Sequence, residues 1–512
     1  MCRVLIAIAE ILLFSALILA SRCANFREVF VGGDVYFTDA DCYSRMTRAR
    51  ICLEDPGTIL RHHSFENFPA GTTPHTTAPL DYLLAGLAAA LKPFTSRALD
   101  MAGAIASPIL GLTTGWFLWW WSRRARIRHR FALLLLYAAS PILAHATQLG
   151  RPDHQALLLA LMAFALCAEF SLINESSRRW SVVSGCSWGL ALWVSLYEPL
   201  ILLGAVALAQ LLIARKSFTA SHRIPGWIVL GVIVLVAFAV ERRMPEWPRN
   251  SELFFNWART IGELSPVPIS DPVWLRWAGL LILAAPALFW IAVAKRRALP
   301  VFLAAALCVT FALTVWQARW ACFFVLMFSL ALPFLLELVA NRLAAGVIAV
   351  VSLYPILQDW DERIWPSEER QALLNEQRVE RVAFREIARG IDGPFLAPWW
   401  WSPALAYWTG QPGTGGSSHE ALDGIERSAR LYLAADPAQA RAILQETRVK
   451  WVVAYDAGRV LANSAELLGV PVPQNALGQV LDRAPSQAPP DFQLAAQNSA
   501  AKLFLVRFFR EK

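Results

Sequence analysis

The chain has 512 residues, of which 56% are hydrophobic, and its formal net charge is +8. Apolar runs of about twenty residues recur from the start to about residue 357, more than the core helices of a soluble protein contain. The positive net charge does not indicate a nucleic-acid partner. Much of it lies in short loops between these runs, where basic residues set the orientation of a membrane protein. The composition therefore excludes a soluble globular protein and indicates a polytopic α-helical membrane protein.

The apolar runs predict eleven membrane-spanning helices. They lie at 4–20, 99–121, 131–149, 154–174, 179–195, 198–214, 223–240, 273–294, 299–316, 320–339 and 343–357. The run at 79–93 is short and contains Asp81, so a helix along the membrane surface is expected there. Residues 4–20 could be a cleaved secretory signal or a first anchor helix. The poor cleavage site that follows favours the anchor.

Basic residues alternate between the loops. Five arginines between residues 123 and 130 separate the second and third spans, and more basic residues follow in every second loop. Such loops remain on the cytoplasmic side. The opposite face then receives the outer loops 22–98 and 241–272 and the C-terminal region. We therefore predict a multi-pass protein of the cell inner membrane with a cytoplasmic N-terminus.

The composition becomes that of a soluble domain after about residue 366. Helices are expected at 367–389 and 437–447, and strands at 451–455 and 503–507. This alternation predicts a modest α/β domain with its own core. The chain is thus divided into a transmembrane domain at 1–360 and an extracytoplasmic α/β domain at 361–512.

Polar residues suited to a metal ion and an anionic substrate fall on the outer face. Asp39 and Asp41 stand in the first outer loop, and Asp153 stands at the outer start of the fourth span. Their carboxylates are hard oxygen ligands for Mg²⁺ or Mn²⁺. Such a metal neutralises a diphosphate and stabilises it as a leaving group. Arg319, at the outer end of a span, could clamp the same diphosphate.

Each of these residues also has a structural alternative. Asp39 and Asp41 could be solvated loop acids, and Asp153, which follows a proline, could cap a helix. Arg319 could be an interfacial anchor. Glu198 stands at a tight outer turn, where an acid at a helix start complements the helix dipole.

Five motifs in chain order resemble those of the oligosaccharyltransferase catalytic subunits, a family of the GT-C superfamily of lipid-dependent glycosyltransferases. They are Asp41 in D-C-Y-S-R, G-R-P-D-H-Q at 150–155, T-I-G-E at 260–263, Q-A-R at 317–319 and A-P-W-W-W at 397–401. The resemblance implies a GT-C-like membrane fold. It also implies protein glycosylation or a related transfer, in which a glycan or sugar passes from a polyprenyl phosphate or diphosphate to an acceptor outside the cytoplasm.

The resemblance also assigns roles to residues. The catalytic residues would be Asp41, Asp153 and Glu263. The metal, Mn²⁺ or Mg²⁺, would be held by Asp41 and Asp153, with Asp39 and Gln155 as further candidate ligands. Contacts with the donor, the acceptor or membrane lipid would come from Arg319, Thr260, Trp399 and Trp400, and His75 is a further candidate from its place in the first outer loop. The tryptophans could stack on a sugar or pack the soluble domain, and His75 could meet phosphate or be a neutral surface histidine.

The acceptor stays open at this point. The family carries an Asp and a Tyr after two tryptophans to read the acceptor sequon, whereas this chain has Trp401, Ser402 and Pro403. The acceptor could be a protein asparagine, or a lipid, a polysaccharide or a hydroxyl side chain. A non-catalytic protein that binds or transports lipid-linked saccharides is a third alternative. Transporters usually place polar residues near the bilayer midplane, so polar residues at the outer ends of spans favour an enzyme.

Overall fold

The computed structural model describes residues 2–74, 78–242, 251–287, 290 and 298–507. Contacts within the chain divide it into two compact units. Unit 1 comprises Met1–Arg27, Ala104–Arg242 and Glu263–Ser367, and unit 2 comprises Glu28–Gly103, Arg243–Gly262 and Glu368–Lys512. Both units are therefore assembled from segments far apart in the sequence.

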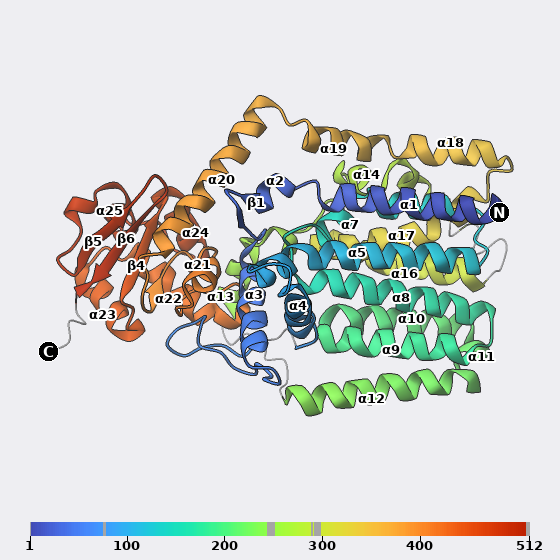
Figure 1. Cartoon of the computed structure of the whole chain (residues 1–512), viewed down its shortest axis with the longest axis horizontal. Helices are drawn as coiled ribbons and strands as arrows, with labels where there is room; N and C mark the ends of the chain where they lie inside the picture. Colours follow the sequence, from blue (N-terminus) through green and yellow to red (C-terminus); the bar gives the residue numbers. More distant parts are fainter. Residues whose placement is uncertain (1, 75–77, 243–250, 288–289, 291–297, 508–512) are drawn as a thin grey trace. The chain divides into compact units, whose positions relative to one another are not determined.

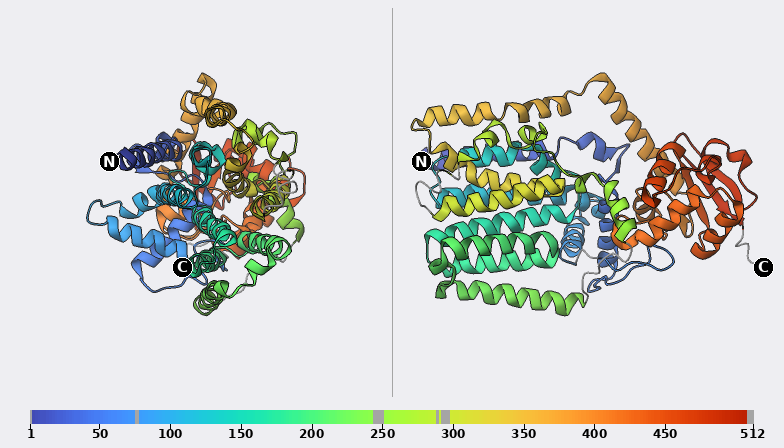
Figure 2. Two further views of the ribbon diagram at one scale, coloured as in Figure 1. Left: turned by 90° about the vertical axis from the view of Figure 1, so that its right-hand side faces the viewer. Right: turned by 180° about the vertical axis from the view of Figure 1, so that it is seen from behind.

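Unit 1 is a bundle of helices that lie side by side, as Figure 1 shows from one side and Figure 2 from behind. Its helices are α1 (Cys2–Arg22), most of α5 (Ala98–Arg124), α6 (Arg130–Ala139), α7 (Pro141–Ala146), α8 (His154–Asn174), α9 (Arg178–Val194), α10 (Tyr197–Ile213), α11 (Arg215–Phe218), η1 (Ser221–Arg223), α12 (Ile224–Glu241), α14 (Val273–Ala278), η3 (Leu280–Ala284), α16 (Ala298–Trp316), η4 (Ala318–Trp320), α17 (Ala321–Leu336), α18 (Arg342–Ser352) and α19 (Tyr354–Ile364). One apolar core joins them, and Trp121, Trp188 and Trp320 are its largest buried side chains. The short helices α2 (Phe26–Val29) and η2 (Gly262–Leu264) lie at the borders between the units' segments.

Five helices of the described residues are long and apolar enough to cross a membrane. They are Val4–Arg22, Ala98–Arg124, His154–Asn174, Ser221–Glu241 and Ala318–Leu336. A sixth crossing results if Arg342–Ser352 and Tyr354–Ile364 are one bent span. The prediction of a polytopic helical membrane protein is confirmed at this level.

Three of the predicted spans are broken within the residues that the structure describes. The run at 273–294 is divided at Gly279, between α14 and η3. The run at 131–149 forms α6 and α7, which are separated at Ser140, and the hydroxyl of Ser140 donates to the carbonyl of Trp277 at 2.7 Å. α18 and α19, in the run at 343–357, meet at an angle of 41°. A proline stands in the first turn of both α7 and α19. Proline lacks an N–H donor and restricts the preceding residue, so a new helix starts there.

A buried arginine fixes the last turn of α1 in unit 1. Arg22 is completely buried, and its guanidinium donates to the carbonyls of Ala138 at 2.6 Å and Tyr137 at 2.8 Å. These carbonyls belong to the last turn of α6, where the helix has no partner of its own for them. The guanidinium also lies over the Tyr137 ring, 4.9 Å from its centroid. Arg22 thus joins α1 to α6 by donating to backbone carbonyls at the end of α6.

Unit 2 combines helices with a four-stranded sheet. Its elements are β1 (Phe30–Val31), β2 (Asp34–Val35), α3 (Ala40–Glu54), α4 (Ala78–Leu91), α13 (Ser251–Arg259), α20 (Glu368–Ala388), β3 (Phe395–Leu396), α21 (Ser402–Thr409), η5 (His419–Ala421), α22 (Leu422–Leu433), α23 (Pro437–Thr447), β4 (Trp451–Tyr455), α24 (Ala457–Leu468), α25 (Leu477–Arg483), η6 (Pro485–Gln487), β5 (Phe492–Gln497) and β6 (Ala501–Val506). The strand order is β3-β4-β6-β5, with β3 parallel to β4 and the other pairs antiparallel. Helices α20 and α25 contact the sheet.

The local expectations for the C-terminal region are confirmed. The helix expected at 437–447 is α23, which starts after Asp436, whose carboxylate accepts from the backbone N–H of Ala438 at 2.9 Å. The strand expected at 451–455 is β4, all five residues of which are buried. In the first outer loop, the helix expected at 79–93 is α4, with the bounds Ala78–Leu91, and its place along the membrane surface stays a prediction. Capping and periodicity are local signals, which explains why these bounds could be read from the sequence.

Unit 2 buries an acidic side chain that couples its stability to pH. Glu66 is 3% exposed, and its carboxylate accepts from the backbone N–H of Ser417 at 3.2 Å. Burial raises the pKa of Glu66 above its usual 4.5, although Arg48 acts in the opposite direction. A raised pKa in the folded state means that the fold favours the neutral acid. Its contribution to stability is thus present below the unfolded-state pKa and is lost as the pH rises through the folded-state value.

We therefore expect Glu66→Gln, which is neutral at every pH, to unfold at or above the wild-type temperature at about pH 7. The decline in unfolding temperature between about pH 4.5 and 7 should be smaller than in the wild type. Thermal unfolding in detergent at a series of pH values measures both effects. Glu446→Gln, which changes an exposed glutamate, is the control. Equal pH profiles for Glu66→Gln and the wild type would contradict this expectation.

Candidate functional site

The start of α8 in unit 1 presents an acidic side chain that does not cap its own helix. Asp153 stands at the N-cap position, but its side chain makes no capping hydrogen bond to the backbone N–H groups of the first turn of α8. Its Oδ1 lies 2.6 Å from Nδ1 of His154, and its Oδ2 lies 3.6 Å from Nη2 of Arg151. The side chain is 7% exposed. The carboxylate of Asp153 is therefore held by its own motif, and the capping alternative does not describe it.

Arg151 lies at the centre of this group. Its Nη2 is 3.5 Å from Oε1 of Gln155 and 3.9 Å from Oε2 of Glu263. The amide nitrogen of Gln155 donates to the same Glu263 oxygen at 3.1 Å. On its other side, Nη1 of Arg151 lies 2.8 Å from Nε2 of His145. A nearly buried guanidinium thus links residues from two of the predicted motifs, G-R-P-D-H-Q and T-I-G-E.

A second ion pair lies beside this group. Arg319 bonds to the carboxylate of Glu198, which is 2% exposed and also accepts from the hydroxyl of Ser195 at 2.6 Å. The guanidinium of Arg319 lies 5.8 Å from the centroid of the Tyr197 ring. Glu198 therefore does more than complement a helix dipole, because it is the counterion of Arg319.

The two groups are neighbours within unit 1. His154 interacts electrostatically with Glu198, and Glu263 does so with Arg319. The backbone holds them together, since Ala318 N–H donates to the Ser265 carbonyl at 2.9 Å. We name the whole set the outer cluster: Arg151, Asp153, His154, Gln155, Glu198, Glu263 and Arg319. Three carboxylates and two guanidinium groups meet in it.

The oxygen atoms of the outer cluster fit a hard divalent cation in type. Asp153 and Glu263 offer carboxylates and Gln155 an amide oxygen, which are donors that Mg²⁺ and Mn²⁺ accept. Among the described residues, however, no group of three or more His, Cys, Asp or Glu side chains is arranged to hold a metal ion. Arg151 stands as the cation against these oxygens. The donor chemistry therefore suits a metal, while the charge balance as it stands comes from an arginine.

The first-loop aspartates belong to unit 2 and have different surroundings. Asp39 caps α3, and its Oδ1 accepts from the backbone N–H of Cys42 at 3.0 Å. Asp41, in the first turn of α3, is exposed. Of the pair, Asp41 is the side chain that faces solvent, while one oxygen of Asp39 is engaged in starting the helix. Thr260 donates to the carbonyl of Trp257 at 2.7 Å, so its hydroxyl ends the helix α13.

The tryptophan run lies among aromatic residues of unit 2. Trp399 donates to Oδ1 of Asn463 at 2.8 Å and lies edge-on to Trp400, with 5.7 Å between ring centroids. Trp401 stacks on Phe384, with centroids 3.9 Å apart. Ser402 is buried, and its hydroxyl donates to the Gly415 carbonyl at 3.1 Å. The positions where the family has Asp and Tyr thus serve packing and a backbone hydrogen bond.

Sequence reasoning placed the outer cluster on one face but missed Arg151. Arg151 stands inside the G-R-P-D-H-Q motif, and a positive charge two residues before Asp153 was the available signal. Its role depends on Glu263, which is more than a hundred residues away in the sequence. His75 lies outside the described residues. His63 belongs to the same predicted outer loop, and its ring stacks on Phe65 with centroids 3.7 Å apart.

This chain is similar in structure to several solved proteins. No protein-family model and no curated protein matches the sequence. The oligosaccharyltransferase of Archaeoglobus fulgidus, tethered with an acceptor peptide that contains an NVT sequon, aligns with a TM-score of 0.67 and 15% identity over 88% of this chain and 69% of its own. The same enzyme in complex with Zn and sulfate aligns with a TM-score of 0.68 and 13% identity, over 94% and 78%.

A second kind of enzyme has the same architecture. ArnT from Cupriavidus metallidurans, bound to undecaprenyl phosphate, aligns with a TM-score of 0.57 and 14% identity over 98% of this chain and 97% of its own. At such identities the similarity shows the fold. The chain therefore has the fold of these two kinds of protein, and the fold expected from the five motifs is confirmed.

Proposed function

We propose that this protein is a membrane glycosyltransferase that moves a sugar or glycan from a polyprenyl phosphate or diphosphate to an extracytoplasmic acceptor. The observation that carries the proposal is the outer cluster, in which two guanidinium groups and three carboxylates meet at one end of the helices of unit 1. Two solved structures with this fold contain a polyprenyl phosphate, dolichol-phosphate in the archaeal enzyme and undecaprenyl phosphate in ArnT. A lipid-linked donor follows from these two observations together.

The residues of the outer cluster divide the work. Arg319 binds the phosphate of the donor through the guanidinium nitrogens that Glu198 does not occupy, because a guanidinium fork matches phosphate oxygens. Glu198 holds Arg319 in position. Glu263 accepts the proton of the acceptor nucleophile while that nucleophile bonds to the anomeric carbon of the sugar. The bond from this carbon to the phosphate oxygen breaks, and the phosphate leaves with the lipid. Arg151 orients Asp153, Gln155 and Glu263.

A divalent cation is part of the proposal. Asp153 would hold it with Asp41, and Gln155, Glu263 and Asp39 are further candidate ligands. When bound, such a cation neutralises the negative charge that develops on the leaving phosphate. The archaeal enzyme has been solved with Zn and sulfate. Mn²⁺ or Mg²⁺ suits the oxygen donors of this chain better, because these ions prefer carboxylate and amide oxygens.

The acceptor belongs to one of two classes, either a protein asparagine or a lipid, polysaccharide or hydroxyl group. Trp401, Ser402 and Pro403 stand where oligosaccharyltransferases read the sequon, and the first two are engaged in packing and in a bond to Gly415. This favours a lipid, polysaccharide or hydroxyl acceptor over asparagine. ArnT also matches this chain over nearly the whole length of both. Trp399 and Trp400 would then contact the acceptor or pack the domain, and Thr260 would position the loop before Glu263.

The placement in the membrane completes the proposal. Eleven spans would carry the transmembrane part at 1–360 in the inner membrane, with the N-terminus in the cytoplasm. The outer loops and the α/β region at 361–512 would lie on the extracytoplasmic side. A reporter fused after residue 512 and active only outside the cytoplasm tests this placement. An active cytoplasmic reporter at that position would contradict it.

Turnover of an undecaprenyl-linked sugar by the purified protein in detergent tests the proposed activity. Release of the polyprenyl phosphate product is followed with a peptide acceptor, a lipid acceptor and no acceptor. Release that depends on an acceptor establishes the enzyme, and the better acceptor identifies its class. Binding of the donor without release under all three conditions would instead support a non-catalytic carrier-binding protein.

Metal removal gives a separate expected result. Chelation with EDTA should lower transfer to the background rate, and Mn²⁺ or Mg²⁺ should restore it, because Asp153 and Asp41 require a cation to act on the phosphate. The matched control is an assay with EDTA already saturated by Mn²⁺ before addition. An unchanged rate after complete chelation would rule out the metal and leave Arg319 and Arg151 as the cationic groups of the site.

A further inference from the structure

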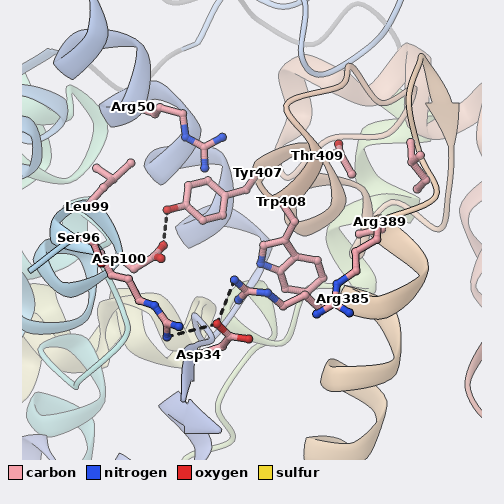
Figure 3. A pocket seen from close by; sticks show the side chains of 13 residues that line it. Asp34, Arg50, Ser96, Leu99, Asp100, Arg385, Arg389, Tyr407, Trp408 and Thr409 are labelled. Carbon is pink, nitrogen blue, oxygen red and sulfur yellow. Dashed lines mark hydrogen bonds and ion pairs between the residues drawn. The ribbon is translucent and has the colours of Figure 1, made fainter. Parts of the chain in front are cut away.

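Unit 2 contains a pocket that the proposed function does not use. It has a volume of about 630 Å³ and is lined by the end of α20, the end of α21, the first turn of α5, and residues of β2 and α3. Figure 3 shows its side chains. Four arginines line it: Arg50, Arg97, Arg385 and Arg389. Arg50 and Asp41 are nine residues apart on α3, which corresponds to about 14 Å along the helix axis, so the pocket is separate from the first-loop aspartates.

The two carboxylates of the pocket are already engaged. Asp34 pairs with both Arg97 and Arg385, each at 3.3 Å. Asp100 accepts a hydrogen bond from the hydroxyl of Tyr407 at 2.5 Å. Four positive charges therefore face two negative ones, and the pocket has a net charge of +2 by these lining residues.

Two arginines carry the excess charge. The guanidinium of Arg50 lies over the Tyr407 ring, 4.2 Å from its centroid, and within the described part of the chain it has no carboxylate partner. The exposed Arg389 also has no carboxylate partner among the described side chains. Figure 3 shows Arg50 beside Tyr407, and Arg389 near Arg385 and Trp408. The pocket thus offers two guanidinium groups beside aromatic side chains, and neither of its two carboxylates forms an ion pair with them.

This arrangement matches a phosphate ester. A guanidinium presents paired N–H donors that fit two oxygens of a phosphate. Trp408, half-buried and part of the lining, offers an apolar face to the carbon atoms next to the phosphate. The volume is sufficient for a headgroup or a monosaccharide phosphate, since small-molecule sites start at about 300 Å³.

The pocket is also close to where a membrane surface should be. Ser96, Arg97, Leu99 and Asp100 line it, and α5 starts at Ala98 and is long and apolar enough to span a membrane. The preceding Phe94 is 83% exposed. Aromatic and basic residues at the end of a span lie at the level of lipid headgroups, and basic pockets there bind anionic headgroups.

We propose that this pocket is a binding site for a phosphate ester that carries net negative charge, presented either by an anionic phospholipid or by a sugar phosphate. Arg50 and Arg389 bind the phosphate oxygens. Asp34 holds Arg97 and Arg385 in place along the wall. The site does not depend on glycosyl transfer, and its occupant is not the donor phosphate bound by the outer cluster.

Binding to the full-length protein in a non-ionic detergent tests the site. The probes are short-chain phosphatidylglycerol against phosphatidylcholine of the same chain length, and glucose 1-phosphate against glucose. We expect the anionic member of at least one pair to bind at least tenfold more tightly than its partner. The double variant Arg50→Gln/Arg389→Gln should lose tenfold or more of this affinity, as removal of charge-assisted hydrogen bonds does.

A matched control and a variant-free measurement complete the test. Arg430→Gln/Arg441→Gln removes two partly exposed arginines that do not line the pocket and should bind as the wild type does. If the double glutamine variant does not fold, the affinity of the wild type is measured at rising NaCl concentrations instead. The dissociation constant should then rise, because salt screens the attraction between the arginines and the phosphate. Preference for phosphatidylglycerol identifies a lipid headgroup, and preference for glucose 1-phosphate identifies a soluble sugar phosphate. Equal affinity of wild type and double variant, or a salt-independent affinity, would overturn the proposal.

Discussion

Replacement of Asp153 by asparagine is expected to lower glycosyl transfer by about 10²- to 10³-fold, the loss typical when a group that stabilises developing charge is removed. Asparagine keeps the shape of the side chain and an oxygen that accepts hydrogen bonds. It removes the negative charge that faces His154 and Arg151 and puts an amide N–H donor in place of one accepting oxygen. The proposed site needs that charge to hold a cation beside the leaving phosphate.

The fold should survive this change. The side chain of Asp153 makes no capping hydrogen bond to the backbone N–H groups of the first turn of α8, so the helix does not depend on it for a cap. The unfolding temperature of Asp153→Asn should therefore stay close to that of the wild type. A loss of activity together with a large loss of stability would point to a structural role.

The matched control for this variant lies at the other end of the same helix. Glu175 follows the last turn of α8, about 31 Å from its start, and pairs with Arg124 at a surface where both side chains are about half exposed. Glu175→Gln should leave transfer unchanged. Full activity of Asp153→Asn beside it would remove Asp153 from the catalytic residues and would also contradict the proposed metal site.

Replacement of Glu169 by alanine is expected to lower the free energy of unfolding by about 3–5 kcal/mol, the loss found when one partner of a buried ion pair is removed. Glu169 is 3% exposed, and Arg223 bonds to its Oε2 at 2.7 Å. Gln210 donates to the same oxygen at 2.6 Å and accepts from Arg223 at 2.7 Å, while Ser184 donates to the other oxygen. Elements α8, α9, α10 and η1 are joined by these four side chains.

The large effect follows from what remains after the substitution. Alanine leaves the Arg223 guanidinium buried without its counterion, which costs more than the pair itself contributes. Glu169→Gln should lose less, because it still accepts and donates hydrogen bonds. The double variant Glu169→Leu/Arg223→Met removes both charges and should recover much of the stability, since an apolar pair of similar volume can replace a buried ion pair.

Unfolding in a mild detergent, followed by heat and by denaturant, measures this series. Glu175→Gln again serves as the control, because surface ion pairs contribute about 0–1 kcal/mol. The order expected from most to least stable is wild type, Glu169→Gln, Glu169→Ala, with the double variant above Glu169→Ala. A double variant less stable than Glu169→Ala would show that the network is needed for more than charge compensation.

The sequence could predict features that depend on neighbouring residues. Runs of apolar residues indicated membrane helices, and α8 begins and ends where its run does, at 154 and 174. The helix α23 and the strand β4 have the predicted bounds because caps, prolines and alternation act over a few residues. The order of five motifs was enough to identify the fold, which the structural matches confirm.

The sequence could not predict which charges meet. Arg223 stands at the start of the span predicted at 223–240, and it is buried with Glu169, because α9 and α12 pack closely around it. Arg319 was expected as a phosphate clamp or an anchor, and the structure gives it Glu198 as a counterion, 121 residues away in the chain. A charge in a membrane protein takes whichever partner packing brings within reach, and hydropathy carries no information on that partner.

The sequence by itself thus determined the class of protein and the local bounds of several helices and strands, since hydrophobic burial is read from composition and period. Only the tertiary structure decided that Arg151 stands among Asp153, Gln155 and Glu263, and that Arg50 and Arg389 line a pocket with more positive than negative charge. Both arrangements join segments that are distant in the chain. Their energies depend on distance and burial, which exist only once the helices have packed.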